Sequence, residues 1–384
     1  MTSTLERAHP PASPPPAPEP RPRRNNRIAV IDGLRLLAAL AVAAFHLGGD
    51  LVVREAWEAR PATVFPTFYS FASWGWLGVE LFFMISGFVI CMSCWGRSPG
   101  QFFRSRVVRL FPAYWPAVLI TTAVVTFWPV VRNRLAWDQI LVNLTMLNMP
   151  MGVPNVDRSY WTLWAEMRFY LLFGVVLVWR GLTLKRTVLF GYGWLVAAVI
   201  TKASKEPLLN LIFQPTFAPF FVAGIAFFLI HKFGPDLYLW GLVALSWALG
   251  VHNIIGRVAG IEDDIKDKLD ARIGMVLVTV FFILLAIIAM GWTARIQWRW
   301  LTWAGVLTYP FYLLHQLVGI SLIHAMNDLR PRLLVLGLVI VILLVLAWLL
   351  HRLVEKPLAR ILKVKLEQAS DGMRRKDTAE APAS

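Results

Sequence analysis

The chain has 384 residues, of which 57% are hydrophobic and only 16% are charged, and its mean hydropathy is +0.58. These values, together with 18 Trp, exclude an ordinary soluble domain and indicate an integral membrane protein. The formal net charge is +15, but in a membrane protein such an excess reflects loop topology, so we predict no nucleic-acid partner.

Apolar runs of roughly 17 to 25 residues, the length that crosses a bilayer as a helix, recur about ten times along the chain. We expect spans at residues 28–48, 73–95, 112–131, 160–179, 187–203, 208–230, 237–255, 273–292, 300–325 and 332–353. The predicted fold is therefore an all-α, polytopic transmembrane bundle. We assign residues 1–26 to a disordered Pro-rich tail, 27–356 to one membrane domain and 357–384 to a polar tail.

Basic residues gather on one side of the predicted spans. Arginines precede span one and follow span two, and further Lys and Arg residues follow spans four and ten. The loops on the opposite side mix acids and bases, as in "GIEDDIKDKLDAR". By the positive-inside rule, both termini are expected in the cytoplasm.

The first span, "IDGLRLLAALAVAAFHLGG", carries two ionisable residues in a helix meant for lipid. Such residues cost at least about 2.5–3.5 kcal/mol on insertion, so each needs a partner, a water cavity or a function. Arg35 and His46 lie about 16 Å apart along the helix, close to three turns, so their side chains share nearly one stripe. Asp32 is spaced to hold the Arg35 guanidinium, whereas Asp50 in "HLGGD" is interpreted as a loop residue.

Spans two and four both enter from the outer face, and each carries one acid, Glu80 or Glu166, at a depth similar to that of His46. A neutral imidazole is well matched to abstracting a hydroxyl proton, and a nearby carboxylate fixes its tautomer. His46, Glu80 and Glu166 are therefore the catalytic candidates for transfer of an acyl group to an alcohol. A His–Glu hydrogen bond that only joins helices fits the spacing equally well.

The two cysteines, Cys91 and Cys94, lie in span two in the sequence "VICMSCW". No second cysteine pair or histidine pair at metal-ligand spacing accompanies them. We interpret them as buried packing residues and predict no metal site.

The segment "FFRSRVVRLFPAYW" places Arg104, Arg106 and Arg109 at the inner membrane surface, with Pro112 beginning the next span. Arg106 and Arg109 are three residues apart, so they share a helical face that could grip phosphates or lipid headgroups. Positive-inside topology with contacts to anionic membrane lipid explains the same residues. Taken with Arg35, they predict an anion site at the cytoplasmic mouth, beneath the stripe that leads to His46.

His315, in "LTYPFYLLHQLVG", falls near mid-membrane in span nine. Lining a substrate tunnel and structural hydrogen bonding are both open roles for it. Trp161 and Trp164 could form an aromatic wall for a sugar, although Trp at the end of a span is more typical of the interface belt.

Several ordered motifs resemble those of a membrane acyltransferase family called acyltransferase 3, which O-acylates extracytoplasmic glycans and some antibiotics. The matching segments are "RIAVIDGLRLLAALAVAAFH" (D-G-L-R-x10-H), "LGVELFFMISGFVI" (G-x-x-x-F-F-x-x-S-G-F), "RSRVVRLFPAYW" (R-x-x-R-x-x-P), "YWTLWAEMRFYLL" (W-x-L-x-x-E-x-x-F-Y), "TYPFYLLHQ" and "EKP". Two departures stand out. Glu80 occupies a position where Asp is common, and Thr162 and Met167–Arg168 replace a common Ser and Glu–Gln, which leaves Arg168 as an extra cation near the acceptor side.

The resemblance implies an acyl-CoA donor, usually acetyl-CoA, that enters from the cytoplasm, and a glycan or lipid-linked sugar acceptor on the outer side. It makes His46 the catalytic histidine and Glu166 the acid of the fourth motif. It assigns donor binding to Arg35, Arg106 and Arg109. The candidates for substrate binding are Trp161, Trp164, Arg168 and His315.

We therefore predict a multi-pass O-acyltransferase of the bacterial cytoplasmic (inner) membrane. Two alternatives stay open: an acyltransferase that tailors a secreted small molecule such as a macrolide, and a proton-coupled transporter or flippase in which Arg35 and His46 form a relay. The sequence does not fix the acceptor, the acyl-chain length or the oligomeric state, so a homo-oligomer also stays open.

Overall fold

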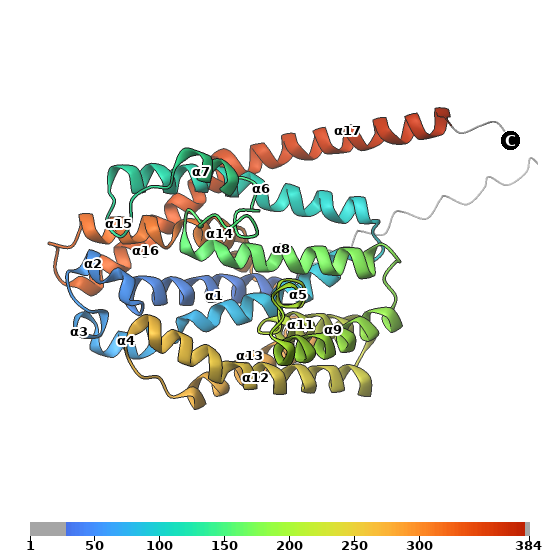
Figure 1. Cartoon of the computed structure of the whole chain (residues 1–384), viewed down its shortest axis with the longest axis horizontal. Coiled ribbons are helices and arrows are strands. Elements are labelled where there is room, and N and C mark those ends of the chain that lie inside the picture. The colour runs from blue at the N-terminus through green and yellow to red at the C-terminus, as the bar shows by residue number, and fades with distance from the viewer. Residues whose placement is uncertain (1–27, 381–384) are drawn as a thin grey trace, which may run out of the picture.

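The computed structural model describes residues 28–380, with side chains described as far as Ser370. The predicted Pro-rich tail, residues 1–26, lies outside these residues. Within residues 28–380 every regular element is a helix, and most of the long helices run side by side in one bundle (Figure 1). The predicted all-α, polytopic fold is confirmed.

Within the described chain, nine helical segments are long and apolar enough to cross a membrane, and a bent pair of helices makes a tenth. The main helices are α1 (Ala29–Gly48), α5 (Gly78–Cys94), α6 (Pro99–Phe127), α8 (Trp161–Phe173), α9 (Leu184–Ser204), α11 (Ala218–Phe233), α12 (Leu237–Ile265), α13 (Ala271–Ala289), α14 (Arg299–Leu314), α15 (Leu317–Ala325), α16 (Arg332–Leu350) and α17 (Lys356–Glu380). Shorter elements connect them: α2 (Arg54–Trp57), α3 (Pro61–Val64), α4 (Pro66–Ala72), α7 (Trp137–Asn143) and α10 (Pro207–Phe213), the 3-10 turns η1 (Leu51–Val53), η2 (Gly75–Leu77) and η3 (Arg158–Tyr160), and the π-helical turns η4 (Gly174–Val178) and η5 (His351–Glu355).

Helix α6 begins well before the predicted third span. We expected Pro112 to begin that span, but the helix runs from Pro99 to Phe127 with Pro112 inside it. Ser98 starts the helix in a capping box, in which its hydroxyl accepts from the Gln101 N–H and the Gln101 side chain accepts from the Ser98 N–H. An internal proline is tolerated in a membrane helix because neighbouring helices, Ser and Thr side chains or water satisfy the backbone carbonyl that it leaves without a partner. Arg104, Arg106 and Arg109 therefore lie on one continuous helix.

The ninth span is bent where a single helix was expected. Helices α14 and α15 meet at an angle of 74°, and His315 and Gln316 occupy the break. Pro310 lies inside α14, five residues before His315, so it does not sit at the break itself. The break places two polar side chains in the interior of the bundle.

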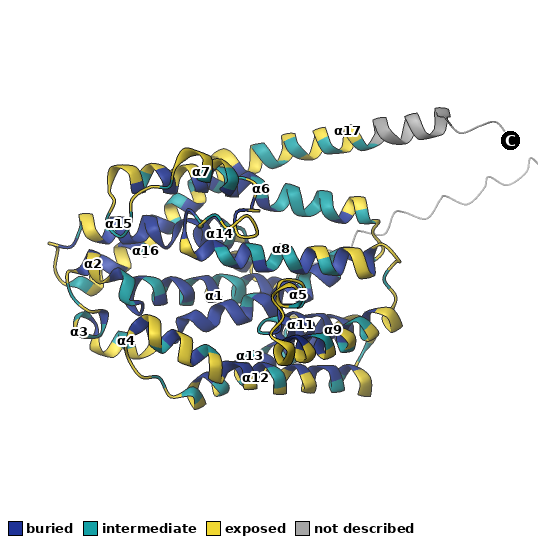
Figure 2. Ribbon diagram, viewed as in Figure 1, coloured by how far each residue is buried: buried dark blue, intermediate teal, exposed yellow. Residues whose placement is uncertain are grey.

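Glycines let three helices of the bundle pack backbone to backbone. A Cβ atom at Gly87 of α5 would overlap the carbonyl oxygen of Phe221 in α11, and a Cβ at Gly224 would overlap the carbonyl oxygen of Met84. Gly78 brings the start of α5 against the backbone of α1 in the same way. Small residues at such contacts are the usual means by which membrane helices approach closely. Figure 2 shows α5 and α11 almost entirely buried, with exposed residues on the outer helices.

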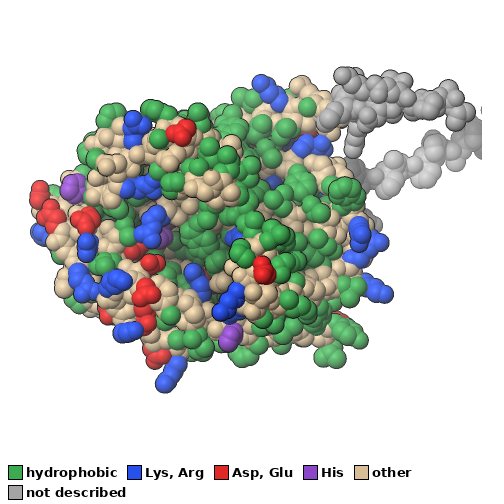
Figure 3. All heavy atoms as spheres, viewed as in Figure 1, with side chains coloured by type: hydrophobic (Ala, Val, Ile, Leu, Met, Phe, Trp, Pro, Cys, Tyr) green, Lys and Arg blue, Asp and Glu red, His purple; other side chains and the backbone are tan. Residues whose placement is uncertain are grey.

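The bundle has two chemically different ends. We call the end where α1 finishes the His46 end and the end where α1 begins the Arg109 end. Helix α1 begins and α17 finishes at the Arg109 end (Figure 1). On the face drawn in Figure 3, apolar side chains dominate the middle of the molecule, and most of the visible Asp and Glu residues gather at the His46 end. Such an apolar belt is what a bilayer requires.

Candidate functional site

His46 lies on the last turn of α1, where its ring contacts a carboxylate four residues later. The N–H groups of Gly49 and Asp50 both bond to the carbonyl of Phe45, at 2.7 and 2.6 Å, so the chain turns tightly. This turn brings Asp50 Oδ2 to 3.3 Å from His46 Nδ1, while Asp50 Oδ1 accepts from the Val52 N–H at 3.1 Å. Sequence reasoning treated Asp50 as a loop residue and missed this contact; the i, i+4 spacing was its only signal.

Burial of the Asp50 carboxyl disfavours its charged form, but the bond and charge of His46 and the Val52 amide outweigh burial. The pKa of Asp50 therefore lies below its ordinary value. An ionised carboxylate only accepts hydrogen bonds, so it favours the imidazole tautomer that carries a proton on Nδ1. In that tautomer the lone pair is on Nε2, which has no hydrogen-bond partner among the described residues.

The break between α14 and α15 supplies the second group of residues around His46. Gln316 Nε2 lies 3.2 Å from His46 Nδ1, and the rings of His315 and His46 are 5.4 Å apart between centroids. His315 Nδ1 lies 2.6 Å from the Tyr312 carbonyl, to which it donates. His315 Nε2 and Gln316 Oε1 are buried without a partner within the described chain. The predicted His315 is thus brought beside His46.

A buried carboxyl group, that of Asp157, holds the break in place. Asp157 Oδ2 accepts from the Leu317 N–H at 3.1 Å, and Oδ1 accepts from the Ser159 N–H and hydroxyl at 2.9 and 2.7 Å. Burial raises the pKa of Asp157, and these donors oppose that rise. Asp157 accepts from a backbone N–H at the buried N-terminus of α15, and so gives the bend a physical cause.

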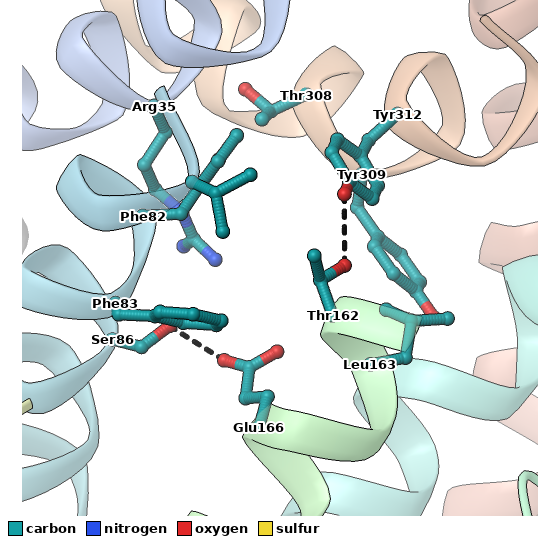
Figure 4. Close-up of a pocket in the computed structure, with 11 residues that line it drawn as sticks. Arg35, Phe82, Phe83, Ser86, Thr162, Leu163, Glu166, Thr308, Tyr309 and Tyr312 are labelled. Atoms are coloured by element: carbon teal, nitrogen blue, oxygen red, sulfur yellow. Dashed lines mark hydrogen bonds between the residues drawn. The ribbon is translucent and has the colours of Figure 1, made fainter. Parts of the chain in front are cut away.

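About one third of the way along α1, Arg35 faces Glu166 across a small cavity of about 60 Å³ (Figure 4). Glu166 comes from α8 and accepts from the Ser86 hydroxyl at 2.6 Å. On the far wall, the hydroxyls of Thr162 and Tyr312 lie 2.8 Å apart. A cavity of this volume has room for only a few water molecules. The structure therefore brings Glu166 to Arg35, and no described contact joins Glu166 to His46.

A larger cavity of about 320 Å³ opens on the other side of Arg35, and Arg109 lines it together with Arg35. Arg109 Nη1 is 3.2 Å from Glu355 Oε1. The other carboxylate oxygen of Glu355, Oε2, is 2.8 Å from His351 Nδ1. Arg109 also lies over the Tyr309 ring at 5.5 Å. Arg35 thus borders both cavities. Two of the three arginines predicted to bind the donor, Arg35 and Arg109, line the same cavity.

Arg106 makes its described contacts outside that cavity. Its guanidinium lies 3.4 Å from the Ser93 hydroxyl and 3.2 Å from that of Ser105, with the Phe102 and Tyr170 rings at 5.9 and 5.8 Å. It therefore contacts α5 and α8, although Arg106 and Arg109 are only three residues apart. Within the described chain it does not line the Arg35–Arg109 cavity.

Glu80 is fully buried and pairs with Arg257 of α12 at 3.1 Å. Arg257 lies over the Trp76 and Phe217 rings at 5.1 and 5.3 Å. No described contact joins Glu80 to His46. Sequence reasoning missed Arg257 because the predicted seventh span ended at residue 255, whereas α12 continues to Ile265.

The other predicted residues lie elsewhere on α8 or in α5. Trp161 packs on Phe83 and Phe217, at 6.3 and 5.3 Å between ring centroids. Arg168 donates to the Leu211 carbonyl at 3.2 Å and lies 5.9 Å from the Trp164 ring, toward α10. Both cysteines are buried and form no disulfide bond, and the Cys94 sulfur lies 3.9 Å from the Ser93 hydroxyl. No group of His, Cys, Asp or Glu that could hold a metal ion occurs in the described part of the chain.

Comparison with known proteins gives one family and several partial relatives. The model of the acyltransferase domain of the acyltransferase 3 family matches residues 28–352. The peptidoglycan O-acetyltransferase OatA of Listeria monocytogenes is 29% identical over 167 residues, which is 38% of this chain and 24% of that protein. Acyltransferase MdmB of Streptomyces mycarofaciens is 26% identical over 154 residues, 38% of each chain. The matches thus span less than two fifths of these relatives, and no solved structure matches the chain.

Proposed function

The chain belongs to the acyltransferase 3 family, and from this premise we propose that it moves an acyl group, in the usual case acetyl, from acyl-CoA to a hydroxyl of a glycan or lipid-linked sugar. The observation that carries the proposal is the placement of Arg35 and His46 on one helix. Arg35 borders the cavity that Arg109 lines, and His46 presents an unpartnered Nε2 about 16 Å farther along α1.

In the proposed reaction, His46 Nε2 removes the proton of the acceptor hydroxyl. The acceptor oxygen then bonds to the thioester carbonyl carbon, the carbon–sulfur bond breaks, and the proton passes from the imidazolium to the departing thiolate of coenzyme A. Asp50 stabilises the imidazolium through Nδ1. A 180° rotation of the Gln316 side-chain amide exchanges Nε2 for the unpartnered Oε1 beside His46 Nδ1. In this orientation Oε1 accepts a hydrogen bond from the His46 Nδ1–H.

Side-chain contacts connect the two ends of the proposed path. The central cavity beside Arg35 is lined by Tyr312, whose ring is 5.1 Å from that of His315, which in turn is 5.4 Å from His46. His315 therefore serves as a wall of the path, with its unpartnered Nε2 available to a passing polar group. The small volume beside Arg35 requires the path to widen when the acyl group passes.

We propose the bacterial cytoplasmic membrane as the location, with the Arg109 end in the cytoplasm. The basic residues of the Arg109 end and the mixed charges of the His46 end support this orientation. The name of the relative OatA refers to peptidoglycan, and this favours a glycan acceptor over a secreted small molecule.

The test measures coenzyme A release and acceptor acylation by purified protein supplied with radiolabelled acetyl-CoA. We expect His46→Ala to abolish both while insertion and thermal unfolding stay near those of the wild type. Near-normal acylation by this variant would remove His46 as the base. A wild-type protein that moves a substrate across vesicles but never consumes acetyl-CoA would instead be a transporter.

A further inference from the structure

A groove of about 660 Å³ lies outside the bundle at the Arg109 end, between the first turns of α6 and the described part of α17. Figure 1 shows α17 running beside α6 in this region. Arg97 and Arg104 line one side, and Lys363 and Glu367 line the other. Val108 and Leu366 add apolar surface between them. The volume is in the range of pockets that hold small organic ligands.

The groove carries an excess of unpaired positive charge. Within the described chain, the guanidinium groups of Arg97 and Arg104 have no hydrogen bond or ion pair. Lys363 has only a distant contact of 4.0 Å with Glu367, and both side chains are more than half exposed. Such an exposed pair is weak and gives way readily to a stronger anion. Three cations and one acid therefore face a space that suits phosphate groups.

Both walls of the groove lead to the cavity that Arg109 and Arg35 share. Arg104 precedes Arg109 by five residues on α6, about 7.5 Å along the helix. Lys363 follows Glu355 by eight residues across the π-helical turn and α17. Because Arg109 and Glu355 are joined at 3.2 Å, the helices that form the two walls converge at Arg109, which lines the inner cavity.

We propose that this groove binds the nucleotide end of acyl-CoA, with its phosphates on Arg97, Arg104 and Lys363, while the pantetheine arm enters the Arg35–Arg109 cavity. The inference rests on the proposed function and adds a phosphate site that sequence reasoning did not assign. The apolar surface of Val108 and Leu366 suits the flat face of a nucleobase. A lipid headgroup has no nucleobase, so this surface favours the nucleotide as the occupant.

The test uses the full-length protein in detergent and adenosine 3′,5′-bisphosphate as the binding probe. We expect Arg104→Gln and Lys363→Gln each to weaken binding about tenfold, because each removes one charge-assisted contact. Lys365→Gln is the matched control, since Lys365 is exposed on α17 but does not line the groove. The KM for acetyl-CoA rises by a similar factor with kcat unchanged. Acetyl-pantetheine, which lacks the nucleotide, shows no such rise.

Equal affinity of the wild type and both groove variants for the bisphosphate would overturn the proposal. The proposal would also be overturned if the two groove variants lost only the binding of phosphatidylglycerol in nanodiscs, because the groove would then be a lipid site. If the wild type consumes acetyl-CoA but the variants do not differ, only the groove assignment fails. If binding depends on the groove but acetyl-CoA is never consumed, the groove stands as a nucleotide site and the proposed function fails.

Discussion

Asp50 offers the sharpest test of the proposed role of His46 as a base. Asp50→Asn removes the negative charge but keeps an oxygen that can accept from the Val52 N–H, so the turn after α1 is retained. At 3.3 Å and an effective dielectric constant of about 20, a full imidazolium–carboxylate pair attracts by about 5 kcal/mol. A proton half transferred in the transition state feels about half of this, about 2.5 kcal/mol, which corresponds to about 70-fold in rate.

We therefore expect Asp50→Asn to lower kcat for coenzyme A release about 70-fold at saturating acetyl-CoA and acceptor. The KM for acetyl-CoA stays unchanged, because Asp50 lies at the end of the bundle opposite Arg109. Asp50→Ala is the control for the turn, since it also loses the bond to the Val52 N–H. A kcat for Asp50→Asn within threefold of the wild type, with His46→Ala inactive, would refute the coupling between Asp50 and His46.

Three further predictions concern stability, measured by thermal unfolding in detergent. Arg257→Ala leaves the buried carboxylate of Glu80 without its ion-pair partner and should lower the free energy of unfolding by about 3 kcal/mol. The double variant Arg257→Ala/Glu80→Gln should recover part of this loss, because it removes the unpaired charge. Gly87→Ala forces a Cβ into the α11 backbone and should unfold the protein at lower temperature, whereas Gly193→Ala, with open space around it, should not. Because the folded-state pKa of Asp50 is lowered, its contribution is complete above about pH 4 and is lost as pH falls through that pKa; a wild type no more acid-sensitive than Asp50→Asn would contradict this.

The sequence is sufficient to predict the approximate number and positions of the spans, because the bilayer requires each to be long and apolar. It also predicts the meeting of Arg35 and Arg109, since alternating spans bring the start of α1 and the R-x-x-R segment to one end. It does not predict the early start of α6 or the bend between α14 and α15. The partner of Glu80 could not be predicted in this way. Arg257 is 177 residues away, and only the packing of α12 against the aromatic rings of Trp76 and Phe217 brings it into contact.

The residues that surround His46 could not be predicted from the sequence either. The bend at His315 carries no helix-breaking residue, and it depends on a cap from Asp157, which lies 160 residues before the Leu317 N–H that it accepts from. The Asp50 contact depends on two backbone hydrogen bonds to Phe45 that keep the chain within one turn of His46 after α1 ends. In both places the decisive group is one backbone N–H or C=O, which no pattern of residue types reveals.

The glycine contacts of α5 give the central cavity one stiff wall and one adjustable wall. Gly78 and Gly87 set α5 against the main chains of α1 and α11, so these three helices can separate only by losing close backbone packing. Helix α8 meets α5 through the hydrogen bond between Glu166 and Ser86, and the π-helical turn that follows it can absorb a change of register. On the proposed path, an acyl group that passes Arg35 would gain room by displacing α8. The spacing of Arg35 and His46 would stay constant, because both residues lie on α1, which α5 packs against closely.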